Sequence, residues 1–309
     1  GGLTPCIRKC SINYYLYVVN RDNIYYKVFY EMNLLVTFGC SWTFGTRCWY
    51  DETNKESEDN MIKQKQQAVI NKDKSKLIEF RKIKKANEKK YLDKLTFRAL
   101  LAQRHDYNQI NFASKASSNH TQMRRAQEFF NTDEWKKYNK VIVLWGITST
   151  ARGEVWVKEI PKSKFTIEER KNTVGEFKSF LYTKNSEIAK IMRESHYDNE
   201  SEVRRLATNM NHWNTYFKLL GVENYWFDTF NHHNYDVTSM IFKNDKPRDL
   251  MSKLCMYEGE DNYHHSSYRI DCKIPKLLIE RGILNPHSLH PTVKGHVMIA
   301  DMLDKQISW

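Results

Sequence analysis

Two short segments, one near each end of the chain, carry the residue types of nucleophilic catalysis. They are residues 38–45 (FGCSWTFG) and residues 290–296 (HPTVKGH). Ser41 follows an apolar run, at a predicted tight turn from a strand into a helix, where free N–H groups favour a developing negative charge. His290 comes just before the predicted last helix. A hydroxyl and an imidazole that meet supply a nucleophile and its general base.

The elements that must position these two residues alternate between strand and helix. Buried strands are predicted at about 33–38, 109–113, 140–145 and 224–227. Helices are predicted at 95–104, 118–130, 165–195, 200–220, 276–281 and 292–306. Such alternation is typical of a parallel sheet covered by helices on both faces. Open sheets of this kind place their sites at the carboxyl edge, so we expect Ser41 and His290 to meet there.

Two middle segments extend this pattern to a family. Residues 111–119 (NFASKASSN) are similar to N-x-A-x-x-G-x-S-N, and residues 145–152 (WGITSTAR) follow the central strand where a G-x-N-D block would stand. Together with the two outer segments, they resemble the SGNH (GDSL-type) hydrolase superfamily, in the variant often found in phage-borne members. The resemblance covers residues 32–309 apart from 51–95. It implies a flavodoxin-like three-layer α/β/α sandwich with a central parallel sheet.

The resemblance also implies roles for individual residues. Ser41 would attack an ester carbonyl while His290 takes its proton. The oxyanion would be held by the backbone N–H groups of Ser41 and Ala116, together with the hydroxyl of Thr148 or Ser149. No metal and no cofactor is implied.

The chain departs from the family pattern at several of these positions. Ala116 replaces a glycine but keeps its N–H group, and Thr148 or Ser149 replaces an asparagine. Cys40 replaces an aspartate and is expected to point away from the site. His287 stands where the family has the aspartate that orients the histidine, and a neutral imidazole cannot do this by charge.

Other residues could then orient His290 or contact a substrate. His287 itself, a backbone carbonyl, Asp228 and Asp236 are the candidates for the orienting partner. Asn119 is a further candidate contact. Arg152 is interpreted either as a contact for a substrate carboxylate or phosphate or as part of a structural ion pair.

Composition limits the class of protein. The chain has 309 residues, of which 40% are hydrophobic and 13% aromatic, so a disordered or low-complexity protein is excluded. Lys and Arg number 49 against 37 Asp and Glu, giving a net charge of +12, which allows an anionic partner. No apolar run approaches the roughly 18 residues of a membrane helix, and no signal peptide is recognised. We therefore predict a cytoplasmic or virion-associated protein without membrane partners. Six sparsely spaced cysteines fit a reducing compartment.

The chain is expected to have one main domain. Residues 1–31 are interpreted as an N-terminal extension and residues 32–309 as the hydrolase-like domain. A charged helical insertion interrupts this domain at about 51–95. Residues 51–90 contain 12 Lys or Arg and 8 Asp or Glu, a net charge of +4. One or two solvated amphipathic helices are expected there, dispensable for folding. Nucleic-acid binding by the insertion is disfavoured because no aromatic residues interleave its lysines.

The leading functional hypothesis is a serine esterase or acetylhydrolase that acts on a small ester or an O-acetylated carbohydrate. The alternative is a non-catalytic structural or binding module of a virus particle, on a degenerate SGNH scaffold. In that case its partners would be other virion proteins. The missing acid at His287 and the missing oxyanion asparagine favour the alternative.

Overall fold

The fold was analysed on a computed structural model of the chain. The structure describes residues 14–18, 24–28, 32–46, 48, 55–157, 176–181, 187–195, 198–229, 254 and 273–309. Its centre is a sheet of four parallel strands in the order β4-β3-β5-β8. The strands are β3 (Asn33–Gly39), β4 (Tyr107–Asn111), β5 (Val141–Ile147) and β8 (Glu223–Asp228). The four predicted strands and the α/β class are thus confirmed.

The register of the sheet aligns the ends of its strands. Gly39 at the end of β3 pairs with Gly146 on β5, and Ile147 pairs with Asp228 at the end of β8. The strand β5 is buried along its whole length, as its uninterrupted apolar sequence predicts for a parallel sheet covered on both faces. The segments that leave β3, β4, β5 and β8 therefore start from one common edge.

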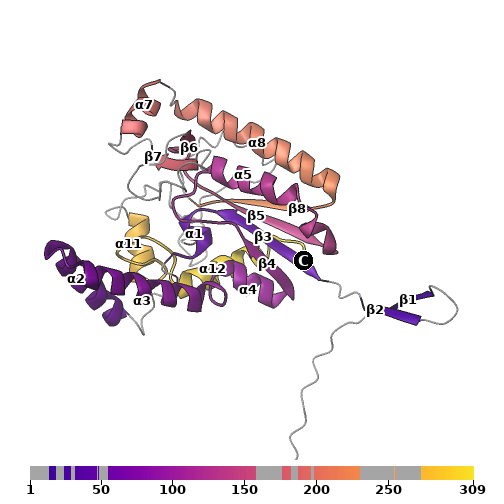
Figure 1. Cartoon of the computed structure of the whole chain (residues 1–309), viewed down its shortest axis with the longest axis horizontal. Coiled ribbons are helices and arrows are strands. Elements are labelled where there is room, and N and C mark those ends of the chain that lie inside the picture. Colours follow the sequence, from indigo (N-terminus) through magenta and orange to yellow (C-terminus); the bar gives the residue numbers. More distant parts are fainter. Residues whose placement is uncertain are drawn as a thin grey trace, which may run out of the picture.

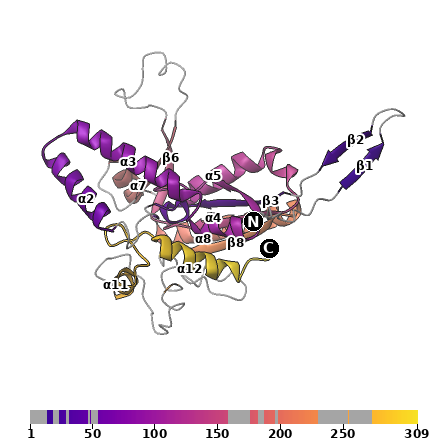
Figure 2. The same cartoon turned by 90° about the horizontal axis from the view of Figure 1, so that it is seen from below.

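Helices cover both faces of this sheet (Figure 1). On one face, α4 (Phe97–Arg104), α11 (Lys273–Glu280) and α12 (Val293–Asp304) share a hydrophobic cluster with Leu35, Ile142 and Phe227. On the other face, α5 (Asn119–Phe130), the 3-10 helix η1 (Glu134–Lys137) and α8 (Asn199–Leu220) pack on Val36, Val143 and Trp145. The view turned by 90° shows α12 and α5 on opposite sides of the strands (Figure 2).

One predicted helix is wrong in part. Residues 165–195 were expected to be helical, but Glu176–Leu181 form the strand β7, which pairs antiparallel with β6 (Arg152–Val157). Of the described residues in this range, those at its end are helical, as α7 (Glu187–Ser195). The sequence EFKSFL is rich in aromatic residues that favour strands, and β6 supplies its hydrogen-bonding partner. Residues 165–175 and 182–186 of the predicted helix lie outside the described ranges.

The charged insertion forms two helices, α2 (Lys55–Ile70) and α3 (Lys74–Leu92), as predicted. Asp73 caps α3 by accepting a hydrogen bond from the N–H of Lys76. The two helices pack chiefly on each other and project from the sheet domain as an arm, hereafter the α2–α3 arm (Figures 1 and 2). The expected N-terminal extension contains a two-stranded antiparallel hairpin, β1 (Tyr14–Val18) with β2 (Ile24–Val28). Among the helices of the described ranges, none combines the length and the apolar character that crossing a membrane requires.

Candidate active site

The structure brings Ser41 and His290 into contact, although 249 positions separate them in sequence. Nε2 of His290 lies 2.8 Å from Oγ of Ser41. Ser41 is the first residue of the four-residue helix α1 (Ser41–Phe44), which follows β3 directly. Its side chain is 8% exposed, so it lies just below the surface. The distance is that of a hydrogen bond and suits proton transfer from a hydroxyl to an imidazole.

The position of Ser41 depends on Thr43, two residues later in the same helix. Thr43 is completely buried over the ends of β3 and β5. A Cβ atom on Gly39 or on Gly146 would lie 2.1 Å from Thr43 Oγ1, so neither position has room for a larger residue. Two paired glycines therefore let α1 sit directly on the edge of the sheet.

Cys40 points into the core, as the sequence predicted. Its side chain is fully buried within the hydrophobic cluster on the α4 and α12 face, and its Sγ lies 3.8 Å from Oγ1 of Thr229. A thiol in this position supports the turn rather than facing a substrate.

The loop that carries His290 is closed by its own hydrogen bonds. The N–H of Asn285 donates to the carbonyl of His290, at 2.8 Å, and Leu284 forms a bridge with Pro291. The buried side-chain oxygen of Asn285 accepts the N–H of His287 and the hydroxyl of Ser288. This tight closure forces Leu289, directly before His290, into the left-handed region at φ 54°. Such strain occurs where the surrounding structure fixes a side chain firmly, which favours a functional histidine.

Ala116 occupies the backbone conformation that a glycine would adopt. Its φ is 60°, and it lies in a turn closed by a hydrogen bond from Ser117 N–H to the carbonyl of Ser114. Ser114 N–H in turn donates to the carbonyl of Gly39, at 3.1 Å, which fixes the turn beside the end of β3. Lys115 places its ammonium 5.2 Å from the ring centre of Phe44 in α1. The turn therefore adjoins the Ser41 helix, as an oxyanion-binding segment requires.

Asn119 fixes the segment that contains the other two oxyanion candidates. Its amide makes a reciprocal pair of hydrogen bonds with the backbone of Thr148, at 2.8 and 2.9 Å. The Thr148 side chain is fully buried, whereas Ser149 is half-buried. The Ser149 hydroxyl accepts the N–H of Ala151, so its own proton can be donated elsewhere. Ser149 is therefore the more accessible of the two hydroxyl donors.

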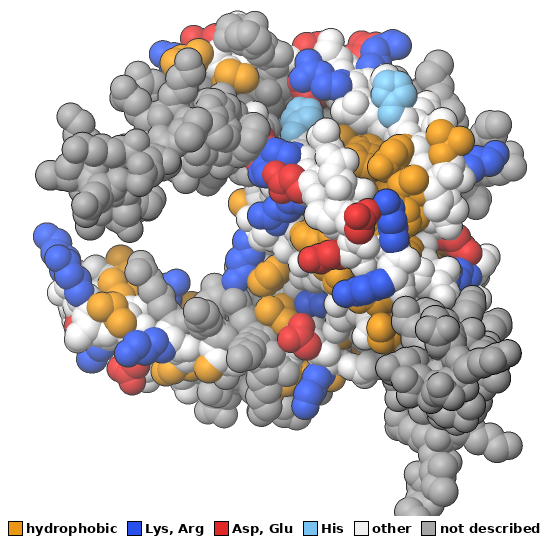
Figure 3. Space-filling view, turned by 45° about the vertical axis from the view of Figure 1, so that its right-hand side comes forward, with side chains coloured by type: hydrophobic (Ala, Val, Ile, Leu, Met, Phe, Trp, Pro, Cys, Tyr) orange, Lys and Arg blue, Asp and Glu red, His pale blue; other side chains and the backbone are white. Residues whose placement is uncertain are grey.

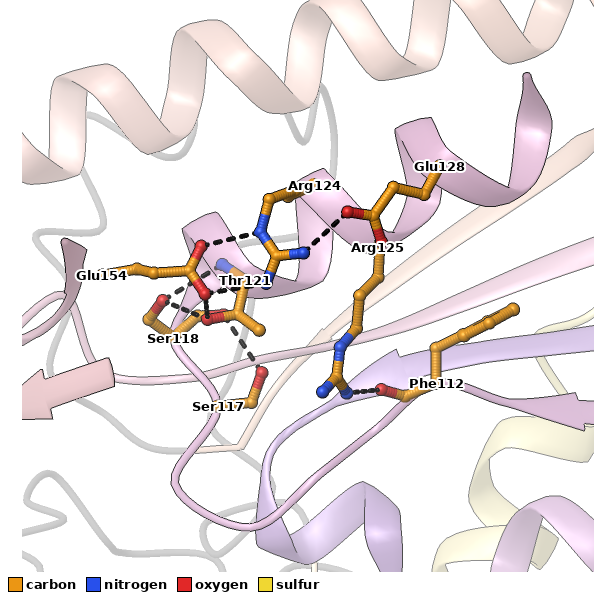
Figure 4. Close-up of polar contacts among 8 residues, drawn as sticks. All are labelled: Phe112, Ser117, Ser118, Thr121, Arg124, Arg125, Glu128 and Glu154. Atoms are coloured by element: carbon orange, nitrogen blue, oxygen red, sulfur yellow. Dashed lines mark hydrogen bonds and ion pairs between the residues drawn. The ribbon is translucent and has the colours of Figure 1, made fainter. Parts of the chain in front are cut away.

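Side chains of α5 also contact the strand β6 and the residues that precede the Ala116 turn (Figure 4). Arg125 donates to the carbonyl of Phe112, at 2.6 Å, ahead of the Ala116 turn. Arg124 donates twice to the carboxylate of Glu154 on β6, which also accepts the Thr121 hydroxyl. These bonds raise the pKa of Arg124, which stays charged. One helix thus ties together the Ala116 turn, the Thr148 segment and the β6–β7 ribbon.

Arg152 lies beside this assembly at the start of β6. With Asn119, Thr150 and Glu202 it lines a small pocket between α5 and α8. Buried Glu202 also lies 3.1 Å from the guanidinium of Arg205. The pocket therefore lies between the segment that follows Thr148 and the helix α8.

The orienting candidates differ in burial. Asp228 is 2% exposed and ends β8 at the same edge of the sheet as Ser41. His287 is exposed, and its backbone N–H donates to Asn285. Asp236 lies outside the described residues. Burial therefore favours Asp228 over His287.

A second histidine lies behind His290, on α12. His296 is completely buried, and its Nδ1 accepts the N–H of Phe97 at the start of α4. Burial, with a smaller contribution from the nearby Arg98 and His290, lowers its pKa from 6.5 to about 3. His296 is thus a neutral link between α4 and the helix that follows His290.

Sequence reasoning identified Ser41 and His290 but missed the residues that position them. These are Thr43, Gly146, Asn285, Arg124, Arg125 and Glu154. The glycine at the end of the second central strand was a usable signal, because it pairs with the glycine before Ser41. Arg124, Arg125 and Glu154 carry no comparable signal, because in the sequence they cannot be distinguished from charged residues on the surface.

Comparison of the chain with protein-family models, with curated proteins and with solved structures gave no match. The functional argument therefore stands on the geometry of this site.

Proposed function

We propose that the protein is a serine hydrolase of carboxylic esters, of the SGNH type. The observation that carries the proposal is the 2.8 Å contact between His290 Nε2 and Ser41 Oγ at the carboxyl edge of a parallel sheet. The order of its four strands across the sheet, 2-1-3-4 along the chain, supports the proposal because it agrees with the first four strands of the 2-1-3-4-5 order of flavodoxin-like sheets, which bind ligands at this edge.

The reaction proceeds in two steps. Nε2 of His290 takes the hydroxyl proton as Ser41 Oγ attacks the ester carbonyl. The oxyanion accepts hydrogen bonds from the N–H groups of Ser41 and Ala116 and from the Ser149 hydroxyl. The alcohol leaves with the proton from His290, and an acyl group remains on Ser41. His290 then deprotonates a water molecule, which releases the acid and restores the serine.

We propose Asp228 as the orienting acid because it is a buried carboxylate at the same edge of the sheet as Ser41. Within the described part of the chain, the structure shows no hydrogen bond between Asp228 and His290, so in this proposal the two side chains meet only when a substrate binds. A small ester or an O-acetylated carbohydrate is the proposed substrate class.

A fluorophosphonate probe tests the proposal directly, because it reacts only with an activated serine. Mass spectrometry should find the label on Ser41. The Ser41→Ala variant should lose labelling and at least about a thousandfold of its ester hydrolysis. Ser308→Ala, which removes an exposed hydroxyl, should behave as the parent protein does.

The alternative is a non-catalytic module of a virus particle on the same scaffold. His287 in place of an acid favours it. An unlabelled Ser41 in correctly folded protein would support this alternative and reject the hydrolase.

A further inference from the structure

The two helices of the α2–α3 arm differ strongly in net charge, and the proposed reaction does not explain this difference. The helix α3 contains eight Lys or Arg and two Glu, a net charge of +6, whereas α2 has three basic and three acidic residues. The chain as a whole carries +12, so one 19-residue helix holds half of the net charge. The asymmetry lies within one hairpin, which makes a general solubilising role a poor explanation.

The basic side chains of α3 that the structure describes, those of Lys74, Lys76 and Lys82, are all exposed to solvent. Lys74, Ile78 and Lys82 follow one another at intervals of four residues, so they lie along one side of the helix. All three are exposed, Ile78 at 53%. Leu77 and Phe80, which lie toward the other side, are half-buried. Lys76 lies on the opposite side from Lys74, because two residues turn an α-helix by about 200°. The helix α3, about 28 Å long, therefore presents exposed lysines on more than one side.

The root of the arm adjoins the candidate nucleophile. Gly45, whose N–H donates to the carbonyl of Ser41 at 3.1 Å, has no room for a side chain: a Cβ there would lie 2.3 Å from Thr96 and 3.1 Å from Leu92. Leu92 is the last residue of α3, and buried Arg98 donates to its carbonyl. The basic helix therefore ends one contact away from the Ser41 turn. Figure 3 shows basic side chains on the projecting lobe at the lower left, which is the arm.

We propose that the α2–α3 arm binds an acidic polysaccharide and holds it across the active site, so that the hydrolysed ester is an O-acyl group on a polyanionic chain. This inference rests on the proposed ester hydrolysis. A helix with a net charge of +6 complements repeated carboxylates along a polymer. Nucleic acid fits less well, because its sugar-phosphate backbone carries no carboxylic ester for the proposed reaction.

The test compares two charge-reversed variants of the full chain. Lys74→Glu with Lys82→Glu reverses two exposed charges on α3, and Lys63→Glu with Lys65→Glu makes the same change of charge on α2, where both lysines are also exposed. Three substrates are used: O-acetylated polygalacturonate, O-acetylated xylan, which has a neutral backbone, and 4-nitrophenyl acetate.

The α3 variant should raise KM for acetylated polygalacturonate by about tenfold at low salt, with kcat unchanged. Its hydrolysis of acetylated xylan and 4-nitrophenyl acetate should equal that of the parent, and the α2 variant should show a much smaller change. High salt should remove the difference. Equal effects of the two variants, or no effect of either, would overturn the proposal.

Binding to unacetylated polygalacturonate separates this inference from the proposed function. A parent protein that binds this polymer through Lys74 and Lys82 but hydrolyses no ester would retain the arm's role and reject the hydrolase. Tighter binding to duplex DNA than to polygalacturonate at physiological salt would reject the arm's role, whatever the hydrolysis results.

Discussion

The carboxyl edge of the sheet and the α2–α3 arm are built in opposite ways. At the edge, buried polar groups are fixed by reciprocal hydrogen bonds, such as those between Asn119 and Thr148. On the arm, large apolar side chains are exposed to solvent, including Val69 at 56% and Ile70 at 71%. A substitution at the edge should therefore change folding or catalysis, whereas one on the arm should change only the binding of a partner. Each prediction below tests this division.

The largest expected effect concerns the residue that orients His290. Asp228→Asn should lower kcat by at least about a hundredfold while leaving the fold intact. The amide favours the wrong tautomer of His290, and it does not stabilise the positive charge that His290 gains in the reaction. His287→Gln is the comparison, and its kcat should stay within about threefold of the parent because this side chain is exposed. Steady-state hydrolysis of 4-nitrophenyl acetate measures both. The reverse order of effects would move the orienting role to His287.

The next effect concerns the packing of α1 on the sheet. Gly146→Ala places a methyl group 2.1 Å from Thr43 Oγ1 and should cost about 1–3 kcal/mol of unfolding free energy. Thr43→Ala removes that oxygen, so the double variant should recover part of the loss, and the rest should remain because the new Cβ would still lie 2.9 Å from Cζ of Phe227. Gly39→Ala should not be rescued, because its Cβ also meets Thr43 Cβ, at 2.4 Å. Urea denaturation measures all of these variants. Equal rescue at the two glycines would show that α1 shifts freely on the sheet.

A third effect is a dependence of stability on pH. His296 has a pKa of about 3 in the folded protein and about 6.5 when exposed, so the unfolded chain binds a proton that the folded chain does not. Stability from this group is complete above pH 6.5 and is lost as the pH falls toward 3. The loss is on the order of a few kcal/mol. In the His296→Gln variant, the midpoint of urea denaturation should depend less on pH over this range. The free energy of unfolding of this variant at pH 7 should be lower than that of the parent. An unchanged slope would place the acid sensitivity elsewhere.

A smaller effect is expected at the Ala116 turn. Ala116→Gly relieves the left-handed conformation at φ 60° and should raise the unfolding free energy by less than about 1 kcal/mol. Ala102→Gly, within α4, should lower it by about 1 kcal/mol or more, because glycine weakens a helix interior. Thermal denaturation compares the two. A destabilised Ala116→Gly variant would mean that the methyl group itself supports the turn.

The sequence predicts most strongly what depends on local pattern and topology. The apolar runs of β3 and β5 fix the parallel sheet, and chain order then brings Ser41 and His290 to one edge. The strand β7 was not predicted, because residues 176–181 form a strand by pairing with β6 rather than through a local sequence pattern. The roles of Thr43 and Arg124 were not predicted from the sequence for a related reason. Each depends on a contact distant in sequence, with Gly146 or Glu154, and no periodicity reports such a contact.

The smallest effect on the sheet domain should come from removing the arm itself. Replacing residues 56–90 by a short Gly/Ser linker should leave the unfolding free energy within about 0.5 kcal/mol of the parent, because α2 and α3 pack chiefly on each other. Hydrolysis of 4-nitrophenyl acetate should also persist. The replacement keeps Leu92, whose side chain fills the space beside Gly45.

The matched control is the same replacement combined with Leu92→Ala. This variant loses a contact at the root of the arm and should be destabilised by about 1–2 kcal/mol relative to the replacement alone. The pair locates the boundary between the two regions at Leu92. If the replacement alone precipitates or loses esterase activity, the arm belongs to the folding core and the division between edge and arm is wrong. If only acetylated polygalacturonate ceases to be a good substrate, the arm acts on the polymer and the edge on the ester bond.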